Sequence, residues 1–346
     1  MKIYFAVFAI YLICLSFVTN IFYPYYFQSQ NLFLLDLLGI GFKPPMISFY
    51  IVSILNFLLF GLITRKTLTA KFSKFSLLIY SISPWIHYLT VLQSIYIFFL
   101  LIIQSTFFGF LMLIQNKSSK LGFAIVLVSI VISVYSEITV AITFLILLSL
   151  FIFLKPVNWI NFKLFTLIML SIFVPLVLIS FSYPEALRNI SRNQIRIFSD
   201  PGILAESNRL QGDSKKEGYN LAAKIAENRY FYISKVILIR ILENLFPQTY
   251  FTGEKKLAYF SFTPPIFLGF IIPFVIGLYS LINKTHIRKY LLFLIALTIP
   301  SILSSYLDLT RLIICLPFII LIISLGFLEL FSKKKSEYRF FIFLCI

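Results

Sequence analysis

The chain has 346 residues, of which 60% are hydrophobic and only 12% are charged, and its mean hydropathy is +0.95. About a quarter of the residues in a typical soluble domain are charged, so this composition excludes an ordinary soluble protein and favours a polytopic membrane protein. The formal net charge is +17. Because the cations gather in links between apolar runs, we attribute them to membrane topology and anionic lipid headgroups, and we expect no nucleic-acid partner.

Ten apolar runs, some of them extended by flanking aromatic residues, predict about ten transmembrane helices. The first run follows Lys2 and lacks a small-residue cleavage pattern, which indicates a retained signal anchor and not a cleaved signal peptide. We therefore expect an all-α membrane bundle that forms a single domain over residues 1–346. The predicted helices cover 3–18, 46–63, 75–88, 91–114, 121–135, 138–154, 164–181, 265–282, 290–307 and 312–331.

The links between these runs alternate in charge, and this alternation predicts their orientation. Basic residues are abundant in every second link, where the accompanying acidic residues are Glu329 and Glu337. The positive-inside rule therefore places both chain ends in the cytoplasm. The cations of this set are Lys2, Arg65, Lys66, Lys71, Lys74, Lys117, Lys120, Lys155, Lys163, Lys284, Arg288, Lys289, Lys333, Lys334, Lys335 and Arg339.

Residues 183–264 form one long polar insertion between the seventh and eighth predicted helices, and the same topology makes it an extracytoplasmic loop. Within it, "SDPG" at 199–202 predicts a turn, and "RLQGDSKKEG" at 209–218 predicts a second polar break. Residues 221–246 contain no Pro or Gly, and their near-helical apolar spacing predicts a helix at the outer membrane interface, ended by Pro247. The apolar face of this helix comprises Ile233, Val236, Ile237, Ile241 and Leu245.

The insertion allows two interpretations. It is either a structural lid packed on the bundle or a substrate-facing lid whose cations are placed for phosphate. Loops this long usually carry function, but a structural lid fits the residues equally well.

Several segments, in their order along the chain, carry a family resemblance. They are "SPW" at 83–85, "YSEIT" at 135–139, "IRIFSDPGI" at 195–203, "NRYFYISKVILIRILENLFPQTYFTGE" at 228–254, "TPPIFLGFIIPFVIGLYSL" at 263–281, and "RLIICLPFIILIISLGF", which Arg311 begins. Over residues 75–331 the chain resembles the GT-C integral-membrane glycosyltransferases, in particular the bacterial relatives of the protein O-mannosyltransferase and aminoarabinose transferase family (glycosyltransferase family 39-like).

The resemblance implies a membrane enzyme of the cell envelope, in the bacterial inner (plasma) membrane. Its donor would be a sugar on a polyprenyl phosphate, its acceptor an extracytoplasmic glycan, lipid or protein, and transfer would invert the anomeric carbon. An acidic residue of the first outer loop would serve as base or metal partner, and basic groups would receive the phosphate. This division is chemically sound, because a carboxylate can deprotonate a hydroxyl acceptor and cations offset the charge on a departing phosphate.

The carboxylate that matches this role is Asp36, the sole acidic residue of the first outer loop, where family members carry an Asp-Glu pair. It is either the catalytic base, with a divalent cation as its partner if any cofactor is used, or an interfacial residue that faces water or pairs with Lys43. Lys43 either holds a phosphate or anchors the start of a helix at the "KPP" segment. Glu137 either lines the same cavity as Asp36 or caps the next helix.

Three arginines are candidates for binding the donor phosphate. Arg192 and Arg196 are four residues apart and would share a helix face, either around a phosphate or in solvent. Arg311 either binds phosphate bidentately or forms a local ion pair with Asp308. The cysteines all fall in apolar runs, where they are interpreted as packing residues, and the two histidines are too far apart along the chain to suggest a zinc site. These five residues are Cys14, Cys315, Cys345, His87 and His286.

Two other functions remain open. A non-catalytic membrane scaffold built on the same fold would explain the reduced first outer loop. A flippase or polymerase for lipid-linked glycans is the second alternative. Transporters usually carry ionisable residues in mid-membrane and interrupted helices, whereas nearly every charge here lies at the end of a predicted helix, which favours the transferase.

Overall fold

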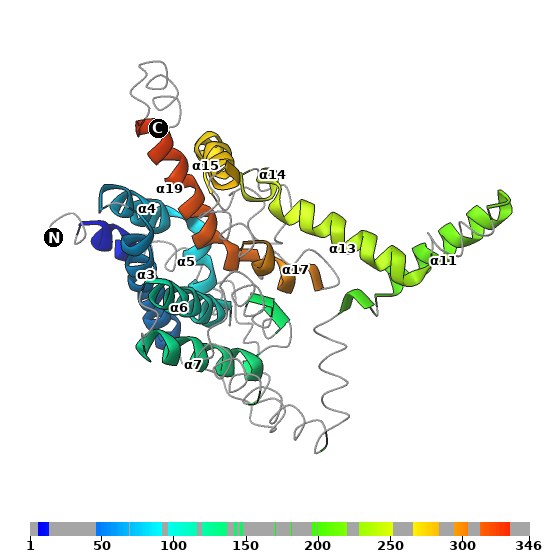
Figure 1. Ribbon diagram of the computed structural model, residues 1–346, viewed down its shortest axis with the longest axis horizontal. Coiled ribbons are helices and arrows are strands. Elements are labelled where there is room, and N and C mark those ends of the chain that lie inside the picture. Colours follow the sequence, from blue (N-terminus) through cyan, green and yellow to red (C-terminus); the bar gives the residue numbers. More distant parts are fainter. Residues whose placement is uncertain are drawn as a thin grey trace.

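A computed structural model describes the chain over residues 6–13, 46–68, 70–91, 96–115, 120–136, 196–198, 200–219, 228–251, 266–283, 294–303 and 312–332, together with a few isolated positions between 142 and 181. Between residues 46 and 332 the described parts of the chain form eleven α-helices and three short 3-10 helices, residues 6–13 are also helical, and the described residues contain no strand (Figure 1). The predicted all-α fold is therefore confirmed.

Among the residues that the structure describes, two helices are long and apolar enough to cross a membrane. They are α3 (Met46–Thr67) and α6 (Tyr96–Gln115), whose spanning segments are Ile47–Thr67 and Tyr96–Leu113. Shorter apolar helices lie within other predicted spans, while predicted spans 138–154 and 164–181 fall almost entirely outside the described residues. The number of ten membrane spans stays a prediction. The shorter apolar helices cover Phe72–Ile82, Leu121–Ile130, Leu268–Asn283, Leu294–Leu303 and Leu316–Phe331.

The predicted continuous helix over 75–88 is wrong. The structure divides it into α4 (Ala70–Ile82) and α5 (Pro84–Val91), with Ser83 between them. Proline has no backbone N–H and disfavours the helical conformation of the residue before it, so Pro84 ends one helix and begins the next. Ser83 donates its backbone N–H to the Tyr80 carbonyl at 3.4 Å, which tightens the last turn of α4.

The closest helix pair is α15 (Ile271–Asn283) with α19 (Leu316–Ser332), which cross at two glycines. A Cβ atom added to Gly277 would lie 2.9 Å from the carbonyl carbon of Ile322, and closer to its oxygen. A Cβ atom added to Gly326 would lie 2.6 Å from the carbonyl carbon of Pro273, again closer to its oxygen. Small residues at such crossings let two backbones touch, which is the common way that apolar helices pack in lipid.

Hydrogen bonds between side chains join α19 to both α4 and α15. Ser76 of α4 donates to Ser324 of α19 at 2.6 Å, and the Ser280 hydroxyl of α15 donates to the Glu329 carboxylate of α19 at 3.0 Å. Such bonds contribute about 0.6 kcal/mol each on average in membrane bundles. The helix α7 (Lys120–Ser136) packs on α6, so that α3, α4, α6, α7, α15 and α19 form the bundle.

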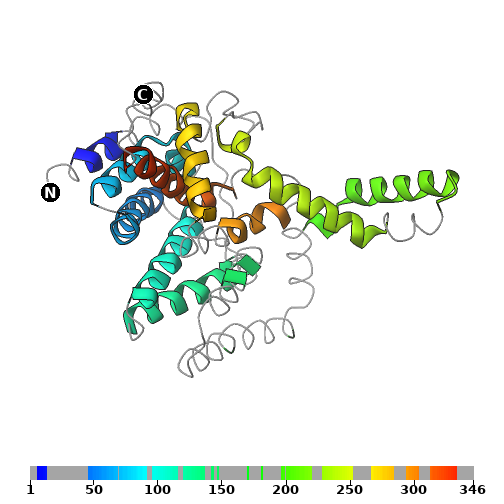
Figure 2. The same ribbon diagram turned by 45° about the horizontal axis from the view of Figure 1, so that its top comes forward.

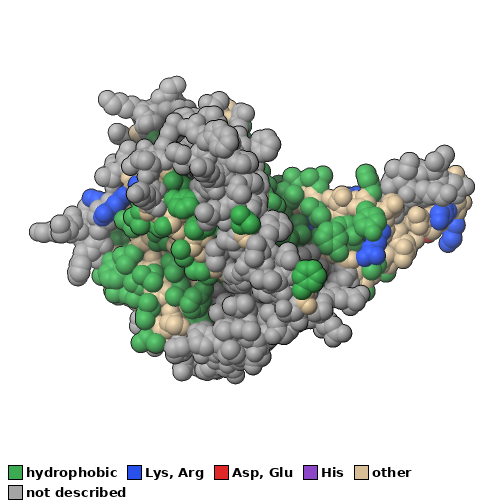
Figure 3. Space-filling model, turned by 60° about the horizontal axis from the view of Figure 1, so that its bottom comes forward, with side chains coloured by type: hydrophobic (Ala, Val, Ile, Leu, Met, Phe, Trp, Pro, Cys, Tyr) green, Lys and Arg blue, Asp and Glu red, His purple; other side chains and the backbone are tan. Residues whose placement is uncertain are grey.

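One face of α3 is apolar and exposed. The residues on it recur every three or four positions, and each is more than two-fifths exposed. Figure 3 shows hydrophobic side chains gathered over one side of the bundle. A surface of this kind on a soluble protein would attract other apolar surfaces, whereas lipid covers it without cost. The residues of the α3 stripe are Ile47, Ile51, Leu55, Leu58 and Leu62.

The polar insertion contributes an arm, which consists of α11 (Pro201–Lys216) and α13 (Arg229–Leu245) and extends away from the bundle (Figures 1 and 2). The predicted turn at 199–202 is wrong, and the predicted break at 209–218 is confirmed only at its end, where the helix stops before Glu217. Asp200 caps α11, because its carboxylate accepts a hydrogen bond from the Gly202 backbone N–H at 2.9 Å, and proline is well tolerated in the first turn. The helix continues through Gly212 and ends before Gly218, whose φ is +89°.

The second helix of the arm confirms the predicted apolar face in part. It begins later than predicted, because Asn228 caps it by accepting a hydrogen bond from the Tyr230 backbone N–H at 3.0 Å. Ile233 is buried, and the other four residues of the predicted face are half-buried. Pro247 ends α13 as predicted and begins the short helix α14 (Pro247–Phe251).

Candidate functional site

The arm joins the bundle at a junction formed by α13, α14, α17 (Ile299–Leu303) and the 3-10 helices η2 (Arg196–Phe198) and η4 (Ile313–Cys315). Both α13 and η2 pack against α17. The backbone N–H of Ile266 donates to the Tyr250 carbonyl at 3.0 Å, which ties α14 to the chain that leads into α15. The junction is where the polar insertion meets the apolar helices, so we describe it as the candidate functional site.

Arg240 is a cation of this junction whose side chain contacts α17. It lies on the face of α13 that turns toward α17, and its guanidinium donates a hydrogen bond to the Ile302 carbonyl at 2.9 Å. Partial burial lowers the pKa of Arg240, while Asp200 and Glu243 act in the opposite direction. Arginine remains protonated in proteins in spite of such shifts, so the junction holds a fixed positive charge that is partly withdrawn from water.

Asn244 follows Arg240 by one helical turn and therefore lies on the same face of α13. Its side chain is fully buried, and neither its amide nitrogen nor its amide oxygen has a hydrogen-bond partner among the described residues. Buried amides are almost always paired, and an unpaired one costs about 1–3 kcal/mol per group. Together Arg240 and Asn244 present a charge, two further donor hydrogens and one acceptor at the inner side of the arm.

Tyr250 is a residue of α14 that contacts η4 at the junction. Its side chain is buried against the Cys315 thiol of η4, and burial raises the pKa of the Tyr250 hydroxyl well above its usual range. The hydroxyl is therefore neutral at physiological pH and can donate a hydrogen bond. This contact also explains Cys315, which is a buried packing residue as the sequence predicts.

The ionic cluster at the outer part of the arm is of a different kind. Arg209 pairs with Glu206 at 2.7 Å and with Asp213 at 3.2 Å, all on one exposed face of α11. The hydrogen bond from Arg209 lowers the pKa of the Glu206 carboxyl. Because these charges satisfy one another in water, the cluster stabilises α11 and does not form a binding site.

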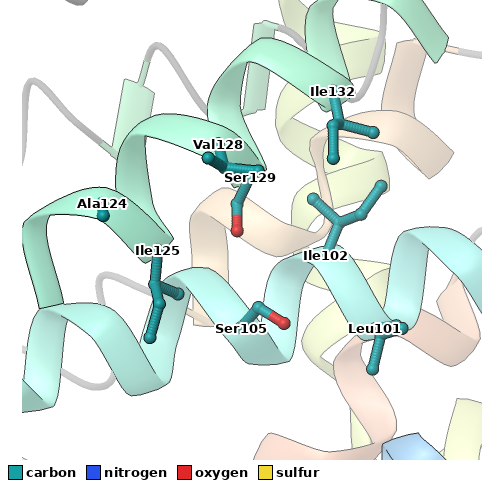
Figure 4. A pocket seen from close by; sticks show the side chains of 8 residues that line it. All are labelled: Leu101, Ile102, Ser105, Ala124, Ile125, Val128, Ser129 and Ile132. Atoms are coloured by element: carbon teal, nitrogen blue, oxygen red, sulfur yellow. The ribbon is translucent and has the colours of Figure 1, made fainter. Parts of the chain in front are cut away.

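An open apolar groove of about 390 Å³ lies between α6 and α7 (Figure 4). Its eight lining residues include the two hydroxyl side chains Ser105 and Ser129, and none is ionisable. A lining of this composition suits a hydrocarbon chain and supplies no acid or base.

The structure describes one of the six predicted site residues, and their roles stay predictions. Arg196 is the first residue of η2, so its backbone lies beside α17 at the junction. The other five candidates, Asp36, Lys43, Glu137, Arg192 and Arg311, lie outside the described residues. The described parts of the chain contain no group of three or more His, Cys, Asp or Glu side chains that could hold a metal ion.

Sequence reasoning missed Arg240 and Asn244, although a signal was present. The apolar run "VILIRILENLF" is interrupted at Arg240 and Glu243, and from sequence alone this interruption indicates only a helix at the membrane interface. In the structure Arg240 and Asn244 lie on the inner face, among the half-buried aliphatic residues. Polar residues on the apolar face of a helix are the pattern that identifies such a site.

No family model matches the chain, and no curated protein is significantly similar to it.

Proposed function

We propose that the chain is an inverting membrane glycosyltransferase that moves a sugar from a polyprenyl-phosphate donor to an extracytoplasmic glycan, lipid or protein. In this proposal the chain lies in the bacterial inner (plasma) membrane, with its amino terminus in the cytoplasm and the arm outside. The membrane location is supported by the two long apolar helices, by the exposed apolar stripe of α3 and by the alternating charges of the links.

The observation that carries the proposal is the half-buried Arg240 at the junction of arm and bundle. A phosphate that leaves a sugar gains charge in the transition state, and donors held in place away from bulk water stabilise that charge. Arg240 and the Asn244 amide supply such donors, and Arg196 begins η2 on the neighbouring side of α17. Asp36 has the role of base, or of ligand to a divalent cation, and Lys43 and Arg311 are further cations for the phosphate.

The apolar surface of the arm also supports a position at the outer surface of the membrane. The outer face of α13 exposes Phe231, Leu238 and Leu242, each more than half exposed. A helix with one such face lies well in the interface between headgroups and acyl chains. The arm would then rest on the outer leaflet, with Arg240 at the depth of the lipid phosphates.

The test is consumption of polyprenyl-phosphate sugars in vesicles that contain the purified protein. Arg240→Gln should lower turnover by about 100-fold or more, as loss of one transition-state donor typically does. Arg209→Gln, which removes an exposed arginine of the same arm, is the matched control and should leave turnover unchanged. Asp36→Asn should abolish turnover if Asp36 is the base. Equal turnover in Arg240→Gln and Arg209→Gln would exclude the junction as the donor site.

One observation favours a second function, a flippase for lipid-linked glycans. The break between α4 and α5 interrupts an apolar helix, and His87 lies buried just after it. Interrupted helices and buried ionisable residues are typical of transporters. Movement of a fluorescent lipid-linked glycan between leaflets, with no release of polyprenyl phosphate, would favour this function over sugar transfer.

A further inference from the structure

The groove between α6 and α7 is a feature of the bundle that the proposed function does not use. The two helices touch at a pair of glycines, because a Cβ atom added to Gly109 would lie 2.9 Å from the Gly122 carbonyl oxygen. The groove begins about one helical turn from this contact, at Ser105, and continues to Leu101 and Ile132. Backbone contact therefore holds the helices together at one end, and space remains between them beside it.

The lining of the groove is apolar apart from two hydroxyl groups. The side chains of Ile102 on α6 and of Ser129 and Ile132 on α7 point into the space between the helices (Figure 4). None of the eight described lining residues is ionisable, so they offer no partner to a charged headgroup or an ion. This lining therefore favours a hydrocarbon ligand.

The dimensions of the groove fit one hydrocarbon chain. Along α7 it extends from Ala124 to Ile132, which is about 12 Å at a rise of about 1.5 Å per residue. One leaflet of the hydrocarbon core of a bilayer is about 15 Å deep, half of the whole. The volume of about 390 Å³ lies near the low end of the range for ligand pockets, about 300–1,000 Å³, which favours a single chain over a whole lipid.

The groove opens sideways onto an exposed apolar surface of α7. Val128 and Ile132 line the groove and are 55% and 48% exposed, so a chain from the bilayer can enter without passing a polar barrier. Inside the groove the chain contacts side chains of two helices. A chain on the convex stripe of α3 contacts one helix only, and because dispersion contacts add up, the chain in the groove is held more firmly.

We propose that the groove holds one acyl chain of a membrane phospholipid as a bound ligand that does not exchange freely with the bilayer. A polyprenyl chain is much longer than the groove, so the length favours an acyl chain. A second copy of the protein is a poorer occupant, because specific protein interfaces involve about 20–30 residues a side and this groove is lined by eight.

Photo-crosslinking of the full chain tests the proposal. The probe is a phospholipid with a diazirine in the middle of one acyl chain, and the crosslinked peptides are located by mass spectrometry. In nanodiscs the probe should label both the groove and the α3 stripe. When the protein is diluted into mixed micelles with excess probe-free lipid before irradiation, labelling of the α3 stripe should be lost and labelling of the groove retained. Equal loss at both surfaces would overturn the proposal.

A pair of variants of α7 ties the retained label to the groove. Ala124→Phe adds a ring to the lining, and Leu121→Phe is the matched control, since Leu121 lies on the same helix outside the lining. Both positions are exposed, so neither ring displaces buried side chains. Retained labelling should be lost in Ala124→Phe and kept in Leu121→Phe. Equal retention in the two variants would overturn the site, and a polyprenyl phosphate found as the retained lipid by native mass spectrometry would overturn the choice of a phospholipid.

Discussion

Replacing Gly326 with alanine should disrupt the packing of α19 against α15. The added methyl group would lie 2.6 Å from the Pro273 carbonyl carbon and 2.9 Å from the Gly277 backbone nitrogen. Ordinary van der Waals contact begins near 3.4 Å. The neighbours are backbone atoms of α15, which cannot rotate aside as a side chain would, so the two helices must separate.

The cost of that separation can be estimated from the geometry. Restoring normal contact moves α15 and α19 apart at this crossing by more than an ångström, because the Pro273 carbonyl oxygen lies closer to the added methyl group than its carbon does. Overpacking of this kind typically costs about 1–3 kcal/mol, and the backbone contact places Gly326→Ala at the upper end. Gly277→Ala meets the Ile322 carbonyl in the same crossing. The two changes share one interface, so the double variant should lose less than the sum of the single losses.

Unfolding of the purified protein in mixed micelles, followed through SDS titration, measures this loss. Gly61→Ala is the matched control, because the added methyl would meet only the flexible Leu77 side chain, at 3.5 Å. In α3 it should be neutral or stabilise by about 0.5–1 kcal/mol, since alanine favours helix interiors more than glycine does. The reasoning is refuted if Gly326→Ala unfolds at the same SDS fraction as Gly61→Ala.

Three further outcomes are expected. Ser76→Ala removes the hydrogen bond to Ser324 and should cost about 0.6 kcal/mol in the same titration, with a loss of several times that value arguing against a simple pair. The hydrogen bond from Arg209 lowers the pKa of Glu206, so the stability that this bond gives α11 is present above the usual carboxyl range and is lost as the pH falls through the lowered pKa. Hydrogen exchange of α11, corrected for intrinsic rates, should therefore accelerate in acid. The Glu206→Gln variant should show no such acceleration. Gly212→Ala, with no atom within 4 Å of the new methyl group, should stabilise α11 by about 1 kcal/mol and so slow its hydrogen exchange. Faster exchange would show that the helix needs glycine there.

Much of the fold could be predicted from the sequence because apolar length is a strong signal. The run that begins at Met46 and the run over 121–135 each became one helix with ends within a few residues of the prediction. The break at Ser83 was missed because the apolar character continues through it, although Pro84 is the residue that causes it. Hydropathy reports that a segment is apolar and says nothing of whether its backbone is continuous.

In the arm, the sequence predicts a turn where the structure has the start of a helix. "SDPG" is a frequent turn sequence, yet here Asp200 and Pro201 are the cap and the first residue of a helix. The two patterns share residues, because a carboxylate before proline satisfies backbone N–H groups in either case. Further along, the ion pairs of Arg209 with Glu206 and Asp213 at helical spacing also favour the helix.

The sequence predicts cations in the polar insertion, but it does not predict which of them lie at the junction. Cations on the outer side for a phosphate were expected, and Arg196 begins a segment at the junction. Arg240 and Asn244 were not identified, because their position on the inner face of α13 depends on how the arm packs against α17. That packing is a tertiary contact, and the sequence signals it only through the polar residues that interrupt the apolar run of α13.

The most direct test of the central claim is the accessibility of two engineered cysteines in a background with Cys14, Cys315 and Cys345 replaced by alanine. Lys215→Cys lies on the exposed end of α11, and Arg65→Cys lies on the exposed end of α3. A membrane-impermeant thiol reagent should label Lys215→Cys in intact cells and Arg65→Cys only after permeabilisation. Labelling of both positions, or of Arg65→Cys alone, in intact cells would contradict a membrane bundle with its polar arm on the outside.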